Sequence, residues 1–244
     1  MKTKHYFLPL LFLSGLVAAQ EIQTDRPDET ELPTTIEMSH VQIESGFSYE
    51  REGEAKNYGV PELVVRYGVF KNFEFRIEDD LRIADENGKS DFGIDPVVLG
   101  IKYHILDHKG LAPDIGLLGR ISIPWLADAA FKENYYSPEI RLLLQHELSK
   151  TCHLSYNAGV HWTAENAKEE YIYTCSADHS ITKKLKLFVE TYGFALPKHH
   201  AENTADAGLL FLVSKNFQLD VVMGSGIMHH FSDKFAEIGF SYRI

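Results

Sequence analysis

Apolar and polar residues alternate along this chain with a period of two, from residue 40 to the last residue, 244. In the first stretch Val41, Ile43 and Phe47 share one parity, whereas Gln42 and Glu44 share the other. Successive side chains of a β-strand point to opposite faces, so this pattern predicts a strand with one apolar face. Stretches of this kind recur along the chain, and we count twelve of them. The sequence therefore predicts an all-β protein of twelve strands.

The links between these strands alternate in length. Short links are predicted near residues 71–72, 107–110, 149–151, 182–184 and 214–216, and longer links near 51–60, 84–93, 125–136, 164–169, 196–204 and 228–234. An even number of strands with tight periplasmic turns and long external loops is typical of a single-chain outer-membrane barrel. We therefore predict a twelve-stranded antiparallel transmembrane β-barrel, an up-and-down meander over residues 39–244, in the outer membrane of a Gram-negative bacterium.

A secreted soluble barrel or sandwich is the alternative, because it would bury the apolar parity in a core. Three features favour the membrane. Aromatic residues such as Tyr49, Phe73 and Trp162 lie near strand ends, as interfacial girdles require. The polar parity mixes Gly, Arg, Glu and His, which suits a crowded wet interior. The alternation also continues to Ile244, so the first and last strands can pair and leave no edge in lipid.

The first 38 residues lack this period. Residues 1–19 carry two Lys followed by an apolar stretch that ends in small residues, which predicts a signal peptide cleaved before Gln20. Residues 20–38 are then a periplasmic N-terminal segment. Three charged residues in it, Asp25, Arg26 and Asp28, could join the charges of the lumen, so partial insertion of the segment into the barrel, as a plug, is favoured over a loose tail.

Charge and cysteine content limit the partners. The formal net charge is -11, which repels phosphate backbones and argues against nucleic acid as a partner. Outer-membrane lipid and a small-molecule solute are the predicted partners. The two cysteines, Cys152 and Cys175, are predicted to stay unbonded. A hairpin centred near residues 166–167 puts Cys175 opposite residue 157 or 158, roughly 16 Å along the strand from Cys152, beyond the ~7 Å Cα limit for a disulfide.

Charged residues on the polar parity are predicted to line the lumen. They could form a selective passage, because rings of charge control permeation, or they could pair across strands and fill a narrow interior. This set comprises Glu44, Glu62, Arg66, Glu74, Arg76, Glu78, Asp80, Arg82, Lys102, Arg120, Glu139, Arg141, Glu147, Glu190, Asp206 and Asp220.

Charge pairing also predicts the register of one hairpin. If Glu62 lies opposite Arg82 and Arg66 opposite Glu78, opposite charges meet across the strands. The neighbouring register would set Arg66 against Arg76 and Glu62 against Asp80, two like-charge contacts. We therefore predict the first register, with a turn at residues 71–73 in which Asn72 adopts a left-handed conformation.

Neither a metal site nor a catalytic site is predicted. Two histidine pairs, His199-His200 and His229-His230, fall in long loops, but adjacent histidines point apart and no ligand spacing completes a site. No cofactor is expected. A lipid hydrolase on the barrel's outer face would need Ser and His together. His146 has the lipid-facing parity, whereas Ser149 lies in a turn and Ser155 shares the lumen parity with His153, so the protein is predicted not to be an enzyme.

Short motifs along the chain resemble one family of bacterial outer-membrane proteins. They are Gln23-Thr24-Asp25-Arg26-Pro27-Asp28, Gln42-Ile43-Glu44, Gly93-Ile94-Asp95-Pro96, Gly100-Ile101-Lys102-Tyr103, Tyr156-Asn157, Phe188-Val189-Glu190 and Asn216-Phe217-Gln218-Leu219-Asp220. The family is labelled as transporters of a phenol-degradation (MetA) pathway. The resemblance implies a channel or transporter for a small solute, such as a hydrophobic or aromatic one. A sealed structural or surface-interaction barrel is the alternative, and a lipid hydrolase is less favoured.

Overall fold

A computed structural model describes residues 21–228 and 233–244 of the chain. The predicted signal peptide and the His229-His230 pair therefore lie outside the described residues. No helix in the described part is long and apolar enough to cross a membrane.

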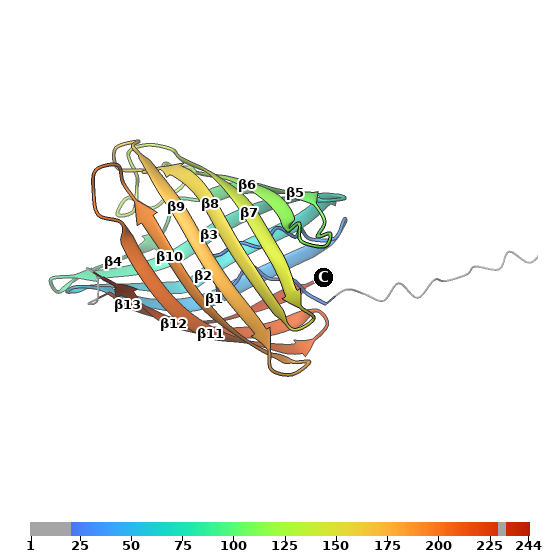
Figure 1. The fold of residues 1–244 in the computed structure, drawn as a ribbon. Coiled ribbons are helices and arrows are strands. Elements are labelled where there is room, and N and C mark those ends of the chain that lie inside the picture. The colour runs from blue at the N-terminus through green and yellow to red at the C-terminus, as the bar shows by residue number, and fades with distance from the viewer. Residues whose placement is uncertain (1–20, 229–232) are drawn as a thin grey trace, which may run out of the picture.

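The chain folds as a meander of antiparallel strands that closes into a barrel (Figure 1). Neighbours in sequence pair from β1 to β4 and from β5 to β13, β3 pairs with β5 as well as β4, and β1 pairs with β13 to close the ring. The strands are β1 (Val41–Glu52), β2 (Ala55–Phe70), β3 (Phe73–Glu86), β4 (Lys89–Ile94), β5 (Val98–Leu106), β6 (Asp114–Ser122), β7 (Ser137–Ser149), β8 (Cys152–Trp162), β9 (Glu169–Ser180), β10 (Leu185–Ala195), β11 (Glu202–Ser214), β12 (Phe217–Ile227) and β13 (Lys234–Arg243).

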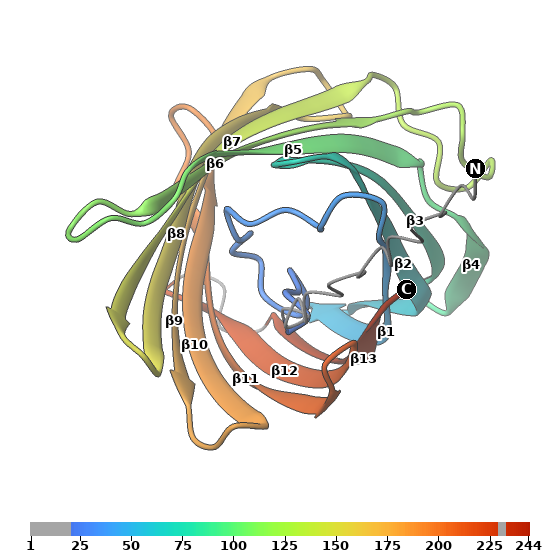
Figure 2. The same ribbon diagram turned by 90° about the vertical axis from the view of Figure 1, so that its right-hand side faces the viewer.

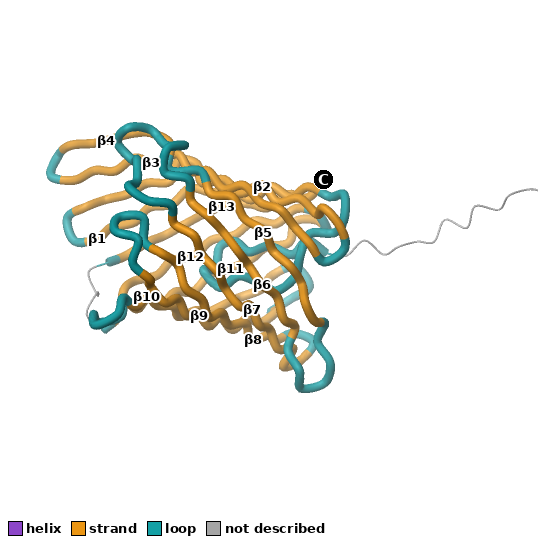
Figure 3. The backbone as a smooth tube through the Cα atoms, turned by 90° about the horizontal axis from the view of Figure 1, so that it is seen from above, coloured by secondary structure: helices purple, strands orange, loops and turns teal. Residues whose placement is uncertain are grey.

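Elements β4 and β5 form a single wall strand. Both pair with β3, and residues 95–97 interrupt the strand between them. The wall therefore has twelve strands, and the predicted fold class is confirmed. Apart from the chain inside the barrel, the turns and loops gather at its two ends (Figure 3).

Alternation in the sequence follows the two faces of the wall. In β5, Ile101 and Tyr103 are 49% and 47% exposed, whereas Lys102 between them is 0% exposed. The apolar parity therefore faces outward, where lipid covers it, and the polar parity faces the lumen. Closure leaves the wall strands paired on both sides, as a bilayer requires, except along β4, which pairs with β3 alone.

Two of the predicted long links are wrong. Residues 51–60 and 84–93 lie mostly in extended hairpins with two-residue turns, at Gly53 and Glu54 and at Asn87 and Gly88. Asn87 and Gly88 have φ angles of 52° and 76°, which suits a tight hairpin turn. The strict apolar alternation lapses there because hairpins that extend into water need no lipid-facing side chains.

The predicted register of β2 and β3 is also wrong. Arg66 lies opposite Arg76, and Glu62 lies opposite Asp80. The turn itself is as expected, since it falls at Lys71 and Asn72, and Asn72 has a φ of 66°. The like charges are tolerated because Glu74 bridges both arginines: its Oε1 lies 2.9 Å from Arg66 Nε and 2.7 Å from Arg76 Nη2.

The hairpin of β8 and β9 differs slightly from the prediction. Tyr156, rather than residue 157 or 158, lies opposite Cys175, and Cys152 lies opposite His179. The two cysteines are therefore offset by four residues, or about 13 Å along the strands.

Candidate functional site in the lumen

The N-terminal segment, residues 21–38, lies inside the barrel (Figure 2). It begins at the end of the barrel that carries the short turns, where the Ile22 amide donates to the Lys215 carbonyl at 2.9 Å. It folds back within the lumen and returns to the same end, where the Ser39 amide donates to the Gly68 carbonyl at 2.8 Å. The segment is thus a loop held against the inner wall before β1 begins.

Asp25 sits among three buried cations of the wall. Its Oδ2 lies 2.9 Å from Arg66 Nη1, 2.7 Å from Arg76 Nη2 and 2.7 Å from Lys102 Nζ. The side chains of these three cations are at most 2% exposed. Charge-assisted hydrogen bonds of this length are the strong class, so Asp25 is a principal anchor of the segment.

Glu31 holds the same cations from a second position. Its carboxylate lies 2.9 Å from Arg76 Nη1 and 2.9 Å from Lys102 Nζ. Burial by itself would raise the pKa of Glu31, but Arg76, Lys102 and then Arg120 hold it well below the usual range. The Glu31 carboxylate is therefore charged at neutral pH.

Asn157 of β8 holds the backbone of Glu31. Its Oδ1 accepts a hydrogen bond from the Glu31 amide at 2.8 Å, and its Nδ2 donates to the Glu31 carbonyl at 2.9 Å. Asn157 is 3% exposed. This two-point contact fixes the segment against β8.

Arg26 contacts the wall on both sides of β1, at β2 and at β12 and β13. Its guanidinium lies 3.4 Å from Glu62, 3.2 Å from Glu237 and 3.5 Å from Asp220. It packs over Gly46 in β1, where an added Cβ would clash with the guanidinium. The absent side chain at this inward position makes room for the segment.

Residues 28–30 bind the wall at β9 and β10. Asp28 accepts a hydrogen bond from the Ser176 hydroxyl at 2.8 Å. The Thr30 amide donates to Glu190 Oε1 at 2.7 Å, and the Thr30 hydroxyl donates to the same oxygen. The segment therefore contacts the wall on all sides of the lumen.

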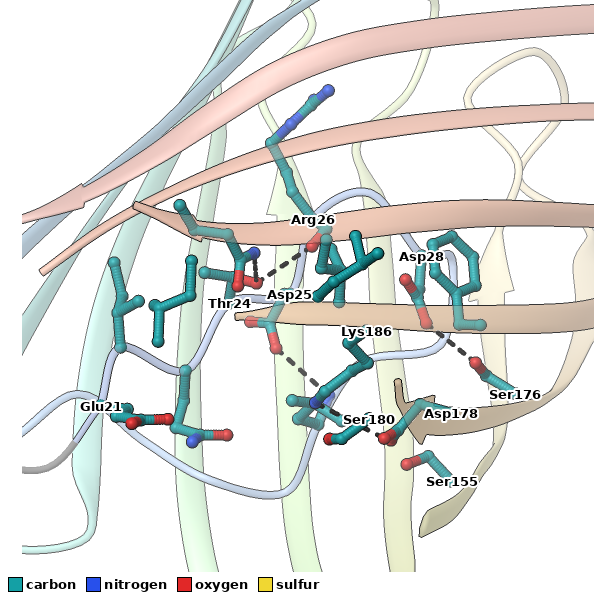
Figure 4. A pocket seen from close by; sticks show the side chains of 18 of the residues that line it. Glu21, Thr24, Asp25, Arg26, Asp28, Ser155, Ser176, Asp178, Ser180 and Lys186 are labelled. Atoms are coloured by element: carbon teal, nitrogen blue, oxygen red, sulfur yellow. Dashed lines mark hydrogen bonds and ion pairs between the residues drawn. The ribbon is translucent and has the colours of Figure 1, made fainter. Parts of the chain in front are cut away.

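The segment separates two cavities. The outer cavity, of about 270 Å³, lies toward the long loops, and ten acidic and four basic residues line it. Its acidic residues include Glu62, Glu78, Asp80, Asp206 and Glu237. The inner cavity, of about 120 Å³, is lined by Ser155, Ser176, Asp178, Lys186 and the start of the segment (Figure 4). The charge of the lining and the cavity volume therefore differ on the two sides of the segment.

The structure places most of the predicted lumen residues on the inner face. Those that are buried are Glu44, Arg66, Glu74, Arg76, Lys102, Arg141, Glu190 and Asp220, and those that are half-buried are Glu62, Glu78, Asp80, Arg82, Arg120, Glu139 and Asp206. Glu147 differs, because it lies exposed next to the bulge that ends β7. Of the predicted plug residues, Asp25, Arg26 and Asp28 all contact the wall.

Four residues that hold the segment were not predicted as site residues. Three of them are uncharged, and the fourth, Glu237, is not among the predicted lumen-lining charges. Gln42 donates to the Gln23 carbonyl at 2.8 Å, and Gln218 donates to the Thr24 hydroxyl at 2.7 Å. Asn157 and Glu237 belong to the same group. Their inward parity was the available signal, since each alternates with outward-facing apolar residues.

The residues considered for lipid hydrolysis are not assembled together. His146 contacts the Tyr156 hydroxyl at 3.0 Å and lies opposite Leu154. Ser155 faces the lumen and accepts a hydrogen bond from Gln145 at 2.9 Å. His153 pairs instead with Asp178 at 3.0 Å. His146 and Ser155 thus lie on opposite faces of the wall.

A family model described as "Putative MetA-pathway of phenol degradation" matches residues 24–244. The chain belongs to this family. The match covers nearly all of the described chain, including the N-terminal segment from Thr24 onward, so the resemblance seen in the sequence motifs is confirmed. A search of curated protein sequences finds no match.

Solved structures share the fold. The COG4313 outer membrane channel from Pseudomonas putida F1 is similar with a TM-score of 0.71 at 8% identity, over 91% of this chain and 100% of that one. The KdgM porin in complex with disordered oligogalacturonate has a TM-score of 0.59 at 11% identity, over 82% and 98%. The NanC porin has a TM-score of 0.58 at 10% identity, over 82% and 98%. The chain is thus an outer-membrane β-barrel with the fold of small channels and porins.

Proposed function

We propose that this protein is a channel for a small solute across the outer membrane and that the N-terminal segment closes it in the state described. The observation that carries the proposal is that the segment reaches strands all around the lumen: Asp25 and Arg26 bind one half of the ring, and the backbone amides of Thr30 and Glu31 bind β10 and β8. Asp25 binds cations of β2, β3 and β5, while Arg26 binds carboxylates of β2, β12 and β13. A segment held this way across the lumen lies on the path of any solute.

The segment is built to be released without unfolding the wall. It contributes no strand to the barrel, and its contacts are mostly side-chain hydrogen bonds and ion pairs. The wall strands bind one another by continuous ladders that do not depend on it. Displacing the segment would therefore join the outer and inner cavities while the barrel stays closed in lipid.

The charge of the outer cavity favours neutral or cationic solutes. Acidic residues outnumber basic ones there, so the field of the cavity attracts cations and repels anions. Its carboxylates also accept hydrogen bonds. The family description points to phenolic compounds, and a neutral aromatic with a hydroxyl group meets both conditions. A purely hydrophobic solute fits this lining less well.

A sealed barrel is the second candidate. The same ion pairs that hold the segment could close the lumen permanently, which would make the protein a structural or surface-interaction barrel. Catalysis is not proposed, since His146 and Ser155 lie on opposite faces of the wall.

Conductance in planar bilayers separates the candidates. We expect the wild-type chain to show low or intermittent current and the Asp25→Asn/Glu31→Gln double variant to show larger, sustained current with cation preference in a KCl gradient. Glu21→Gln is the matched control, because Glu21 is an exposed acid of the same segment. If the folded double variant carries no more current than wild type, the sealed barrel is favoured and the channel proposal fails.

A further inference from the structure

Three potential metal ligands converge at the turn between β5 and β6. They are His104 near the end of β5, Asp107 just after it, and Asp114, the first residue of β6. One ligand atom from each lies within 4.8 Å of the other two. The turn lies at the end of the barrel that carries the C-terminus (Figure 1), on the predicted periplasmic side.

His104 is held in the orientation that a metal ligand requires. Its ring is buried, and its Nδ1 lies 3.1 Å from the carbonyl oxygen of Pro33 in the N-terminal segment. A metal-binding imidazole usually donates its other ring N–H to a carbonyl or carboxylate in this way. The contact leaves Nε2 as the ligand atom on the other side of the ring, where it lies within hydrogen-bond distance of Asp107 Oδ1, at 2.8 Å.

The two contacts of His104 cannot both be hydrogen bonds donated by a neutral imidazole ring. A neutral imidazole carries one N–H, yet acceptor oxygens face both ring nitrogens. One arrangement that satisfies both nitrogens is donation from Nδ1–H to Pro33 with a cation bound at Nε2. A divalent metal ion between Nε2 and the carboxylates provides this arrangement and balances the charges of Asp107 and Asp114.

The surroundings leave room for further ligands. Asp114 Oδ1 accepts a hydrogen bond from the His108 amide at 2.8 Å, so its other oxygen is available. The Asp107 side chain is 93% exposed, so water can complete the coordination.

We propose that His104, Asp107 and Asp114 bind a divalent transition-metal ion, with Zn²⁺ as the representative of the class. Imidazole and carboxylate together suit Zn²⁺ and neighbouring first-row ions rather than Ca²⁺ or Mg²⁺, which prefer all-oxygen sites. The site has no local signal in the sequence, because its ligands follow no familiar spacing and the Pro33 carbonyl that orients His104 comes from a segment 71 residues away.

The test is a Zn²⁺ titration of the purified full chain in detergent, followed by calorimetry. We expect one Zn²⁺ per chain in the wild type and at least tenfold weaker binding in both His104→Gln and Asp114→Asn. His179→Gln is the matched control, because His179 is an exposed histidine opposite Cys152, the next most plausible zinc-binding pair. It should bind like wild type. Heat-dependent migration on gels verifies that each variant is a folded barrel.

Two outcomes would overturn the proposal. One is the absence of stoichiometric binding in the wild type. The other is wild-type affinity in both His104→Gln and Asp114→Asn, whatever His179→Gln does. A second measurement guards against a variant that loses binding through misfolding: Co²⁺ bound to the wild type should give visible absorption without the intense near-ultraviolet band of a thiolate ligand. A thiolate band would place the metal on cysteine instead.

Discussion

Arg66 and Arg76 face each other across the β2–β3 ladder, and Asp25 of the N-terminal segment binds both, at 2.9 and 2.7 Å. Two buried guanidinium groups repel each other unless anions lie between them. Glu74 supplies one such anion from the wall, and Asp25 supplies another from the segment. The wall therefore has a register that the segment helps to make favourable.

Replacing Asp25 should release the segment before it unfolds the barrel. Breaking a buried ion network by removing one partner costs about 3–5 kcal/mol, which corresponds to roughly a hundredfold or more in the open population. We expect Asp25→Asn to increase the rate of proteolytic cleavage within residues 21–38 by this order. Glu21→Gln should cleave like wild type. Equal rates for Asp25→Asn and wild type would mean that Asp25 is not an anchor.

Replacing Asn157 should weaken the docking of the N-terminal segment and leave the pairing of the wall strands unchanged. Asn157→Leu removes two buried hydrogen bonds to the Glu31 backbone, each worth about 1–3 kcal/mol when the partner is left unsatisfied. Because Asn157 and Glu31 hold the same part of the segment, the effects of Asn157→Leu and Glu31→Gln on the opening free energy should be non-additive. Opening can be measured by proteolysis of both single variants and the double variant.

Gln145→Leu is the control for this experiment. Gln145 is a lumen-facing amide that donates a hydrogen bond to Ser155 of the neighbouring strand. Its loss should leave the segment docked. Strict additivity of Asn157→Leu and Glu31→Gln would show that the two residues act on separate parts of the molecule.

A larger side chain at Gly116 tests the docking of the N-terminal segment by steric clash, without changing any charge. A Cβ at this position would lie 2.8 Å from the Pro33 Cα and 2.9 Å from its carbonyl oxygen. Gly116→Leu should therefore push the returning part of the segment off the wall and expose the Ile36 amide, which donates to Glu74 at 3.0 Å. Hydrogen exchange followed by mass spectrometry reports this amide.

Gly119 provides the comparison within the same strand. Its Cβ would meet the Ile101 side chain at 3.8 Å on the outer face, an ordinary contact distance. Gly119→Leu should leave exchange at Ile36 unchanged. Slow exchange in both variants would contradict close packing of Pro33 on Gly116.

Cys152 and Cys175 should remain free thiols in the folded protein. Their strands pair so that four residues separate them along the ladder, about 13 Å, which exceeds the ~7 Å Cα limit for a disulfide. Mass spectrometry of the protein digested without reductant should find both as thiols. An intramolecular disulfide would require a different register of β8 and β9.

The wall was predictable because its signal is local and repeated. A period of two reports only which face a side chain points to, and lipid outside imposes one chemistry on that face along every strand. Strand number, closure and the inward set of charges follow from this period. The turn at Asn72 was also predictable, because it depends on residues adjacent in sequence.

Register and partners were not predictable by the same means. The β2–β3 register was judged from charges directly across two strands, but the deciding anions come from elsewhere: Glu74 from two residues along β3 and Asp25 from outside the wall. A pairing rule for two strands cannot include a third group in the lumen.

The sequence by itself determined the barrel, its twelve strands and which residues face inward, because periodicity records the environment of each side chain one residue at a time. Only the tertiary structure decided what the inward charges bind. Asp25 meets Lys102 across 77 residues of chain, and Pro33 meets His104 across 71. Such contacts exist only once the ring has closed and the segment has folded into it, because electrostatic partners are chosen by distance in space, and no local pattern in the chain encodes that distance.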